Sequence, residues 1–406
     1  MNQIVKIPQA KNEPVKSYAP GDTETLNLKS KLQEMKNTPV DIPMYIGSKE
    51  IFTEEKISMH PPHEINHTLG TFNKGNASHV EAAISAALEA KESWAKMPWE
   101  SRAAIFLRAA DLLAGPYRDR MNAATMLAQS KNAMQAEIDA ACEMIDFFKF
   151  NVQYMSEIYA QQPPENSPGV WNQLEYRPLE GFVFALSPFN FTSIAANLCS
   201  APAMMGNTVV WKPAETQIYS AQVIMELYKE AGLPDGVINL VYVDGPTTGD
   251  VIFNHRDFAG IHFTGSTGVF RHIWKTIGNN IDKYRSYPRI VGETGGKDFV
   301  MVHASADINQ VNTALVRGSF EFQGQKCSAA SRAYIPQSMW TKLKPILVET
   351  TNSLKMGTTE DFSNFINAVI DQKSFDKISS YIDRVNESSE AEVIAGGSYD
   401  DSDGYF

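Results

Sequence analysis

The sequence predicts an α/β fold in which helices cover both faces of a parallel sheet. Between residues 181 and 290, short apolar runs of strand length alternate with helical stretches, and this alternation is typical of βαβ units. The chain has 406 residues, more than one compact core usually accommodates, so we expect two domains. Its 43% of hydrophobic and 20% of charged residues are typical of a globular protein.

Periodicity and turn residues predict the individual elements. Helices dominate from residue 78 to about 161, where Ser78 and Glu81 have the spacing of a capping box and Gly115-Pro116 marks a break. A loop and then an extended arm follow. The sequence predicts strands at 182–186, 208–211, 237–243, 260–263, 299–302, 333–335 and 393–395, and helices that include those from 307, 339 and 371.

These elements suggest three parts. Residues 1–75 are polar and rich in proline, and we expect an arm that wraps a larger body. Residues 76–291 form a Rossmann-like, doubly wound domain, and residues 292–406 begin a second α/β domain. The chain stops soon after the strand predicted at 393–395, so we expect a fragment of a longer protein.

Charge and composition exclude several classes of function. A formal net charge of -11, with no basic stripe, argues against nucleic-acid binding. No apolar run approaches the roughly 18 residues of a membrane span, and residues 1–6 do not begin a secretory or organellar signal. The three cysteines and eight histidines have no disulfide or metal-binding spacing. We expect a cytoplasmic protein that acts on a small molecule, without metal.

Polar turns follow three of the predicted strands, at the edge where open parallel sheets bind ligands. They are 187–191, 212–215 and 265–268. A lysine and an acid, Lys212 and Glu215, can together bind ribose hydroxyls, and a Gly-Ser turn that opens a helix can bind a pyrophosphate. The G-x-G-x-x-G fingerprint is absent, and a Walker motif fails around Gly296-Lys297, so ordinary βα turns remain an alternative.

Cys327 is the candidate nucleophile. It lies in the polar stretch 324–329 beside Lys326, a cation that can lower the pKa of a thiol, whereas Cys142 and Cys199 lie on apolar helical faces. Glu293 lies among glycines that allow close approach to a ligand, although a solvated loop carboxylate is the alternative.

Five segments occur in the order and approximate spacing of the aldehyde dehydrogenase superfamily. Within it the chain resembles most the Δ1-pyrroline-5-carboxylate dehydrogenases, also called L-glutamate γ-semialdehyde dehydrogenases, from about residue 12 to 406. The agreement is closest at 12–15, 135–141, 145–151, 179–183 and 320–329. The five segments are Ser187-Pro-Phe-Asn-Phe, Lys212-Pro-Ala-Glu, Phe263-Thr-Gly-Ser, Glu293-Thr-Gly-Gly-Lys and Gly324-Gln-Lys-Cys.

The resemblance implies a reaction and its residues. Cys327 attacks the aldehyde, Asn190 and the Cys327 backbone N–H hold the oxyanion, and Glu293 activates the water that releases the acid. It further implies NAD as cofactor, an NAD-binding domain over 76–291, a catalytic domain from 292, and a homo-oligomer with an arm near 165–180. The implied NAD-binding residues are Ser187, Lys212, Glu215, Gly265, Ser266, Thr267, Gly268 and Val269.

The same resemblance implies the substrate. Ser328 matches a residue that contacts the α-carboxylate and Phe191 an aromatic that packs on the methylene chain, which favours L-glutamate 5-semialdehyde and its oxidation to L-glutamate in proline degradation. The family continues with a Glu-x-Phe-Gly-Pro segment, a substrate-gripping loop and an oligomerisation strand that this chain lacks, so we expect a C-terminally incomplete catalytic domain.

Three alternatives remain open at this point. The chain could oxidise another semialdehyde by the same chemistry. It could be a cysteine hydrolase that uses Cys327 without a cofactor, although no histidine lies near that motif. It could also be a truncated, non-catalytic homologue that only binds nucleotide or partners.

Overall fold

A seven-stranded sheet forms the centre of the computed structural model, which describes residues 6–406 and leaves the first five residues of the expected arm outside the described range. Its first five strands are parallel, and β2 and β3 extend it in antiparallel fashion. This arrangement confirms the predicted α/β fold. From one edge to the other the strands are β10 (Arg289–Thr294), β9 (Phe258–Gly265), β6 (Phe182–Leu186), β7 (Val209–Lys212), β8 (Ile238–Leu240), β2 (Met44–Ile46) and β3 (Lys49–Ile51).

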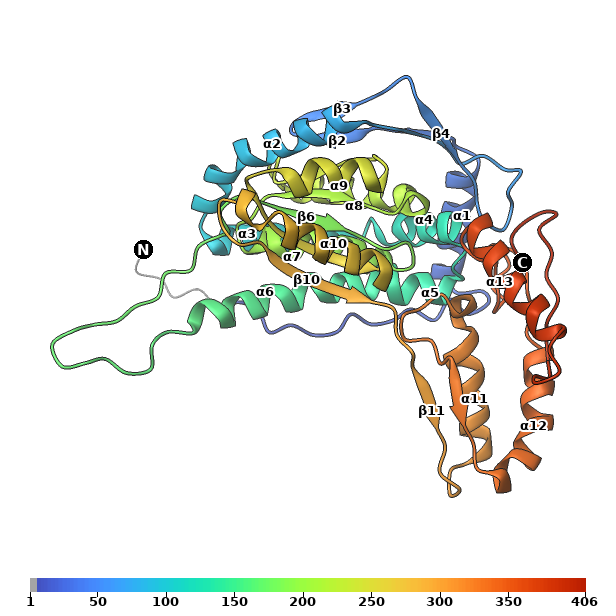
Figure 1. Ribbon diagram of the computed structural model, residues 1–406. Coiled ribbons are helices and arrows are strands. Elements are labelled where there is room, and N and C mark those ends of the chain that lie inside the picture. Colours follow the sequence, from blue (N-terminus) through green and yellow to red (C-terminus); the bar gives the residue numbers. More distant parts are fainter. Residues whose placement is uncertain (1–5) are drawn as a thin grey trace.

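Helices cover both faces of the sheet. This agrees with the central strands, whose residues do not alternate between polar and apolar. The central strands β6 and β7 are apolar and almost wholly buried, which is typical of parallel strands covered on both faces. In Figure 1, α2 and α9 lie above the sheet and α6 lies below it. The helices that alternate with the strands are α7 (Thr192–Met204), α8 (Ile218–Ala231), α9 (Gly245–Asn254) and α10 (Thr267–Asn279), with a short 3-10 turn, η2 (Glu215–Gln217), before α8.

A helical layer precedes the central strands, as the periodicity predicts. The capping box at its start was placed wrongly: Asn76, not Ser78, caps α2, because its side chain accepts from the Ser78 backbone and His79 reciprocates. One segment is a π-helix, a wider winding than the pattern predicts. The layer comprises α2 (Ala77–Lys96), α3 (Trp99–Ala114), α4 (Arg118–Gln129), α5 (Ala133–Ala136), the π-helix η1 (Glu137–Glu143) and α6 (Met144–Ala160).

The order of the strands creates a switch point between β6 and β9. The chain runs from β6 through β7 to β8 on one side, then crosses to β9 and β10 on the other. Helices on either side of such a point diverge, which opens a crevice beyond the carboxyl ends of the strands. Ser187 follows β6 there, and Gly265 and Thr294 end β9 and β10, so the topology brings the predicted polar turns to one edge.

A second, smaller unit with its own apolar core projects from the main body (Figure 1). Its two strands are parallel, and Val302, Leu315 and Leu343 are among its buried residues. The strand expected at 393–395 is wrong, because those residues have no strand partner. The unit includes β11 (Phe299–Met301), α11 (Ile308–Phe320), the 3-10 turn η4 (Glu321–Gly324), β12 (Arg332–Tyr334) and α12 (Gln337–Asn352), and α13 (Gln372–Asn386) follows.

The N-terminal residues are more regular than the expected arm. Besides β2 and β3, they supply a helix and a three-stranded sheet of order β1-β5-β4. Residues 161–181 lack helix or strand and extend away from the body as a long loop, in agreement with the predicted loop and arm (Figure 1). The remaining elements are α1 (Thr23–Lys36), β1 (Val40–Ile42), β4 (Lys56–Met59), β5 (Gly70–Asn73) and the 3-10 turn η3 (Ile281–Lys283).

Candidate active site

A cavity of about 750 Å³ opens at the switch point, and we call it the Ser187 cavity. It is lined from the ends of β6, β7, β9 and β10, and also by the loop that carries Cys327. Its lining includes Ser187, Asn190, Lys212, Phe263, Thr264, Gly265, Ser266, Thr267, Val269, Thr294, Gly324, Gln325, Lys326, Cys327 and, from α13, Lys377.

A second cavity of about 470 Å³ lies beside it, and we call it the Phe191 cavity. The two cavities share four lining residues, of which Cys327 is the only one that carries a thiol. The thiol therefore stands where a molecule in one cavity can meet a molecule in the other. The Phe191 cavity is lined by Glu143, Phe147, Phe191, Ile194, Asn197, Leu198, His262, Phe263, Thr264, Val291, Gly292, Glu293, Cys327 and Ser328.

The loop before Cys327 is held by backbone geometry and by hydrogen bonds. Phe322 and Gln323 adopt positive φ angles of 52° and 55°, which turn the chain sharply after α11. The Cys327 carbonyl accepts from the Gly296 backbone N–H at 3.1 Å, and a Cβ at Gly296 would overlap with that carbonyl. Glycine at 296 therefore allows the chain after β10 to lie against the thiol loop.

The Glu293 carboxylate lies close to the thiol. Its Oε1 lies 3.9 Å from Cys327 Sγ, and the side chain is exposed at the end of β10. The sequence predicts no strand here and gives a loop carboxylate as the alternative, but residues 289–294 pair with β9, opposite Gly260 to Gly265. The strand fixes the carboxylate near the thiol while leaving it accessible to water.

The pKa of the Cys327 thiol is raised, which corrects the expectation drawn from its neighbouring cation. Partial burial is the larger cause, and the Glu293 carboxylate adds to it by disfavouring a second negative charge. Lys326 does not compensate, because its ammonium pairs with Glu321 at 2.6 Å. The other thiols, Cys142 and Cys199, are buried as predicted, and burial raises the pKa of each to about 12.

Asn190, in the loop after β6, contacts the loop that carries Cys327. Its side-chain amide donates to the Gln325 carbonyl at 2.9 Å, two residues before Cys327. Asn190 and the Cys327 backbone thus lie at one junction, which is the arrangement that an oxyanion-binding site requires.

The predicted nucleotide-binding residues mostly share the Ser187 cavity. Lys212 is 8% exposed, and among residues 6–406 its ammonium hydrogen-bonds only to the Pro213 carbonyl, at 3.3 Å, so a cation is available to a ligand. Burial lowers the pKa of Lys212. Ser266 caps α10, and the backbone N–H groups of that helix end offer an anion site. Two residues differ from expectation: Gly268 is outside the lining, and Glu215 lines a separate cavity of about 190 Å³.

Three residues that line the Phe191 cavity were not predicted from the sequence as site residues. Glu143 comes from the π-helix, and Phe147 comes from α6, within the segment 145–151 that carries the resemblance but to which no role was assigned. His262 comes from β9; its Nδ1 lies 3.1 Å from the Leu198 carbonyl, and burial lowers its pKa. A polar residue at 262 within an otherwise apolar strand was the only signal available.

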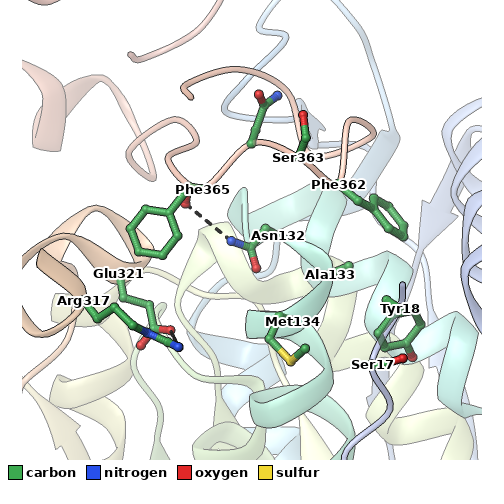
Figure 2. A pocket seen from close by; sticks show the side chains of 11 residues that line it. Ser17, Tyr18, Asn132, Ala133, Met134, Arg317, Glu321, Phe362, Ser363 and Phe365 are labelled. Atoms are coloured by element: carbon green, nitrogen blue, oxygen red, sulfur yellow. Dashed lines mark hydrogen bonds and ion pairs between the residues drawn. The ribbon is translucent and has the colours of Figure 1, made fainter. Parts of the chain in front are cut away.

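Other parts of the described chain offer fewer candidate functional groups. A cavity of about 310 Å³ lies between Tyr18, Asn132 and the loop 362–365, and Figure 2 shows that none of the predicted site residues lines it. Among residues 6–406 no cluster of potential metal ligands occurs. No helix within the same range is long and apolar enough to cross a membrane.

Comparisons with known proteins agree with this geometry. The family model described as "Aldehyde dehydrogenase family" matches residues 51–406. A protein of Dictyostelium discoideum named mitochondrial Δ1-pyrroline-5-carboxylate dehydrogenase is 50% identical over 402 residues, which are 98% of this chain and 72% of that protein. The human protein of the same name is 43% identical over 97% of this chain and 70% of its own length.

Solved structures give the same result. The Δ-pyrroline-5-carboxylate dehydrogenase of Mycobacterium tuberculosis, bound with NAD, superimposes with a TM-score of 0.98 at 50% identity and covers 100% of this chain and 76% of its own. A Thermus thermophilus 1-pyrroline-5-carboxylate dehydrogenase variant is 28% identical, with a TM-score of 0.92 over 99% of this chain and 77% of its own. The matched family model, the two high identities and the shared fold together place this chain in the aldehyde dehydrogenase family.

Proposed function

We propose that this chain carries out the NAD-dependent oxidation of L-glutamate 5-semialdehyde to L-glutamate, the second step of proline degradation. One observation carries the proposal: Cys327 lies where the Ser187 and Phe191 cavities meet, with Glu293 Oε1 3.9 Å from its sulfur. The names of the relatives give the substrate, since the four quoted are Δ1-pyrroline-5-carboxylate dehydrogenases.

The chemistry begins at the thiol. Cys327 Sγ attacks the aldehyde carbon and forms a C–S bond, and the carbonyl oxygen becomes an oxyanion held by the Asn190 amide and the Cys327 backbone N–H. NAD, when bound, supplies the acceptor for the hydride that leaves this thiohemiacetal. Because the thiol pKa is raised, a base must take the thiol proton, and Glu293 is within reach to do so.

Hydrolysis needs a second role for the same carboxylate. Glu293 first releases the thiol proton to solvent and then takes a proton from a water molecule, whose oxygen attacks the thioester carbon. The C–S bond breaks, and Glu293 returns its proton to the leaving sulfur. L-Glutamate leaves and Cys327 recovers its thiol. The exposure of Glu293 supports this role, because water can reach it.

The Ser187 cavity fits NAD by the chemistry of its donors. Ser187, Lys212 and the first turn of α10, with Gly265, Ser266, Thr267 and Val269, line it with hydroxyl, ammonium and backbone N–H groups suited to ribose and pyrophosphate. Gly268 and Glu215 remain part of the proposed set, since they flank the lining. Phe191 and Ser328 would hold the substrate's methylene chain and α-carboxylate in the Phe191 cavity.

An assay of NADH formation tests the proposal. Purified chain, NAD and L-glutamate 5-semialdehyde should yield NADH, and Cys327→Ala should abolish it while NAD affinity stays within a few-fold. Cys142→Ala is the matched control, because that thiol lines neither of the two cavities. Preference for longer or uncharged aldehydes would support another semialdehyde instead. NAD binding without turnover would support a non-catalytic homologue.

We also propose how the chain is organised and where it acts. Residues 1–75, 76–291 and 292–406 would be arm, NAD-binding and catalytic parts. The two separate apolar cores support the boundary between the last two parts, whereas the arm shares the larger core with the NAD-binding part. The loop 161–181 would mediate homo-oligomerisation, since Trp171 in it is 85% exposed. Sedimentation of a variant without this loop tests that role.

A reducing compartment, the cytoplasm, is the proposed location, and the three free thiols support it. The Dictyostelium and human relatives are named mitochondrial proteins, so the compartment needs its own test. Fractionation of the source cells, with the chain detected by antibody, separates the two.

A further inference from the structure

Lys131 and Asp139 form an ion pair in the interior that the proposed chemistry does not use. The two side chains are 1% and 2% exposed, and Nζ lies 2.6 Å from Oδ2. Burial lowers the pKa of Lys131, while the adjacent Asp139 carboxylate opposes that shift. Burying two charges is expensive, and such a pair is often neutral or costly compared with apolar packing. The contacts around it show what it holds.

Asp139 holds the first turn of α7. Its carboxylate accepts from the Thr192 and Ser193 backbone N–H groups, at 3.0 Å each, and from the Ser193 hydroxyl at 2.8 Å. The N-cap residue of α7, Phe191, supplies no capping side chain of its own. An acid from the π-helix, distant in sequence, therefore fixes the residues two and three positions after Asn190.

Lys131 lies between two aromatic rings from opposite sides of the junction. Its ammonium is 4.3 Å from the ring centroid of Phe191 and 4.6 Å from that of Phe322. Phe191 follows Asn190, and Phe322 is buried in the turn that precedes Cys327. A buried cation attracts the face of each ring, so this one side chain holds both.

The neighbours of Lys131 strengthen the same connection. The Gln323 amide donates to the Ser130 carbonyl at 3.4 Å and to the Ala368 carbonyl at 2.7 Å. Figure 2 shows that Asn132, on the other side of Lys131, donates to the Phe365 carbonyl. The connection between α4 and α5 thus contacts both the Asn190 side and the Cys327 side of the site.

We propose that Lys131 and Asp139 are positioning residues that fix the Asn190 amide relative to the Cys327 backbone N–H, the two donors of the oxyanion-binding site. The inference deepens the proposed function and rests on its assignment of those donors. Neither residue touches the reacting atoms. Each acts through the segment it holds: Asp139 through the start of α7, and Lys131 through Asp139 and the two rings.

Two reactions of the Cys327 thiol distinguish a displaced oxyanion donor from a general disturbance of the site. Acylation by p-nitrophenyl acetate passes through a tetrahedral oxyanion: the sulfur bonds to the carbonyl carbon, p-nitrophenolate leaves, and the thiol proton passes to solvent. Alkylation by iodoacetamide displaces iodide and forms no oxyanion. Neither reaction needs NAD. A displaced oxyanion donor slows the first and leaves the second unchanged.

The variant Lys131→Met removes the cation and keeps an unbranched side chain of similar length. We expect the rate of p-nitrophenolate release to fall about tenfold or more, because small displacements at a reacting centre cost large factors in rate. The alkylation rate of Cys327 should stay within about twofold, since the thiol and its carboxylate are untouched. Lys131→Arg, which keeps the charge, should recover part of the loss.

Lys149→Met is the matched control, because Lys149 pairs with Glu13 and lines neither the Ser187 nor the Phe191 cavity. If Lys131→Met does not fold, Asp139→Asn tests the same contacts with nearly unchanged volume. Equal ester cleavage by the parent and either folded variant would overturn the proposal, as would acylation and alkylation that slow by the same factor. Ester cleavage by a parent chain that forms no NADH would instead overturn the dehydrogenase function alone.

Discussion

The side-chain amide of Asn190 donates to the carbonyl oxygen of Gln325 at 2.9 Å, and so links the loop after β6 to the loop that carries Cys327. A primary amide has two N–H donors, and this bond uses one of them. The amide is thereby oriented while its second donor stays available to an oxyanion. The contact therefore supports orientation of the donor before substrate arrives.

Asn190→Ala should lower kcat by about 10²- to 10³-fold, the usual loss when one oxyanion donor is removed. NAD affinity should change little, because Ser187 and Lys212 are untouched. Steady-state kinetics with glutamate semialdehyde, together with NAD titration, measure both. Asn309→Ala, on the exposed side of α11, is the control. A change in KM alone would show that Asn190 binds substrate without stabilising the transition state.

Glu293→Gln should slow release of the acid more than hydride transfer. The amide cannot take a proton from water, so the thioester accumulates. Rapid-mixing experiments should show an NADH burst of full size followed by a slow steady state. If burst and steady state slow by the same factor, Glu293 acts only in removing the thiol proton before hydride transfer, and the hydrolytic role is wrong.

Alkylation of Cys327 should depend on pH in a way set by burial and by Glu293. Both raise the thiol pKa, so the thiolate fraction at neutral pH is small and the rate should rise with pH to a midpoint above the ~8.5 of a free thiol. Glu293→Gln removes a negative charge and should move the midpoint down. Iodoacetamide kinetics from pH 6 to 10 measure the shift, and an unchanged midpoint would contradict the assigned cause.

Lys212→Met should raise the Kd for NAD about tenfold or more, because a hydrogen bond to a charged group typically contributes about 1.5–3 kcal/mol. The buried ammonium lines the Ser187 cavity and contacts only one carbonyl there, so it is free to donate to a ribose. Isothermal titration gives the affinity. Lys229→Met, at an exposed pair with Glu50, should leave it unchanged. Equal affinities in both variants would remove Lys212 from the nucleotide site.

Arg118→Met should lower the free energy of unfolding by about 3–5 kcal/mol, because it leaves a buried charge without its partner. Arg118 is 3% exposed and binds Glu137, Glu13 and the Pro14 carbonyl, which anchors the N-terminal segment. Urea denaturation measures the loss. Arg177→Met, in an exposed pair with Glu180, should change stability by no more than about 0.5 kcal/mol.

The same cluster predicts a loss of stability in acid. Burial alone would raise the pKa of Glu137, but hydrogen bonds from Arg118 and the Lys16 backbone outweigh it and the pKa is lowered. A depressed pKa contributes stability that is present above the unfolded value of about 4.3 and is lost as pH falls through the folded value. Arg118→Met should therefore weaken this acid dependence, and stability that is flat below pH 4 in the parent chain would contradict it.

The fold was predictable from the sequence where apolar periodicity or a helix N-cap residue marks an element. Residues 182–186 became β6, and Asp307 and Asp371 cap α11 and α13 as their positions suggest. Strand β10 was missed because it is polar, exposed and at the edge of the sheet, so hydrogen bonds to β9 define it more than burial does. Residues 393–395 have a strand-like composition but no partner.

The site was predictable only where residues lie in contiguous motifs. Cys327, Glu293 and Asn190 were named from local segments, and the structure brings them together. Glu143 and His262 reach the same cavity from a helix and a strand; Glu143 resembles an ordinary polar residue, and the only local signal at His262 is its polarity within an apolar strand. Lys131 and Asp139, eight positions apart, likewise resemble solvated charges until tertiary packing buries them.

The π-helix between Glu137 and Glu143 limits which deletions this protein can tolerate. A π-turn accommodates one more residue than regular α-winding, and each α-helical residue rotates about 100° around the axis. If the segment were regularised by deleting one residue upstream of Asp139, its carboxylate would swing to another side of the helix and leave the start of α7 without its cap. Consensus redesign that treats this stretch as a defect would improve helix regularity and remove the contacts that hold the proposed oxyanion-binding residues in place.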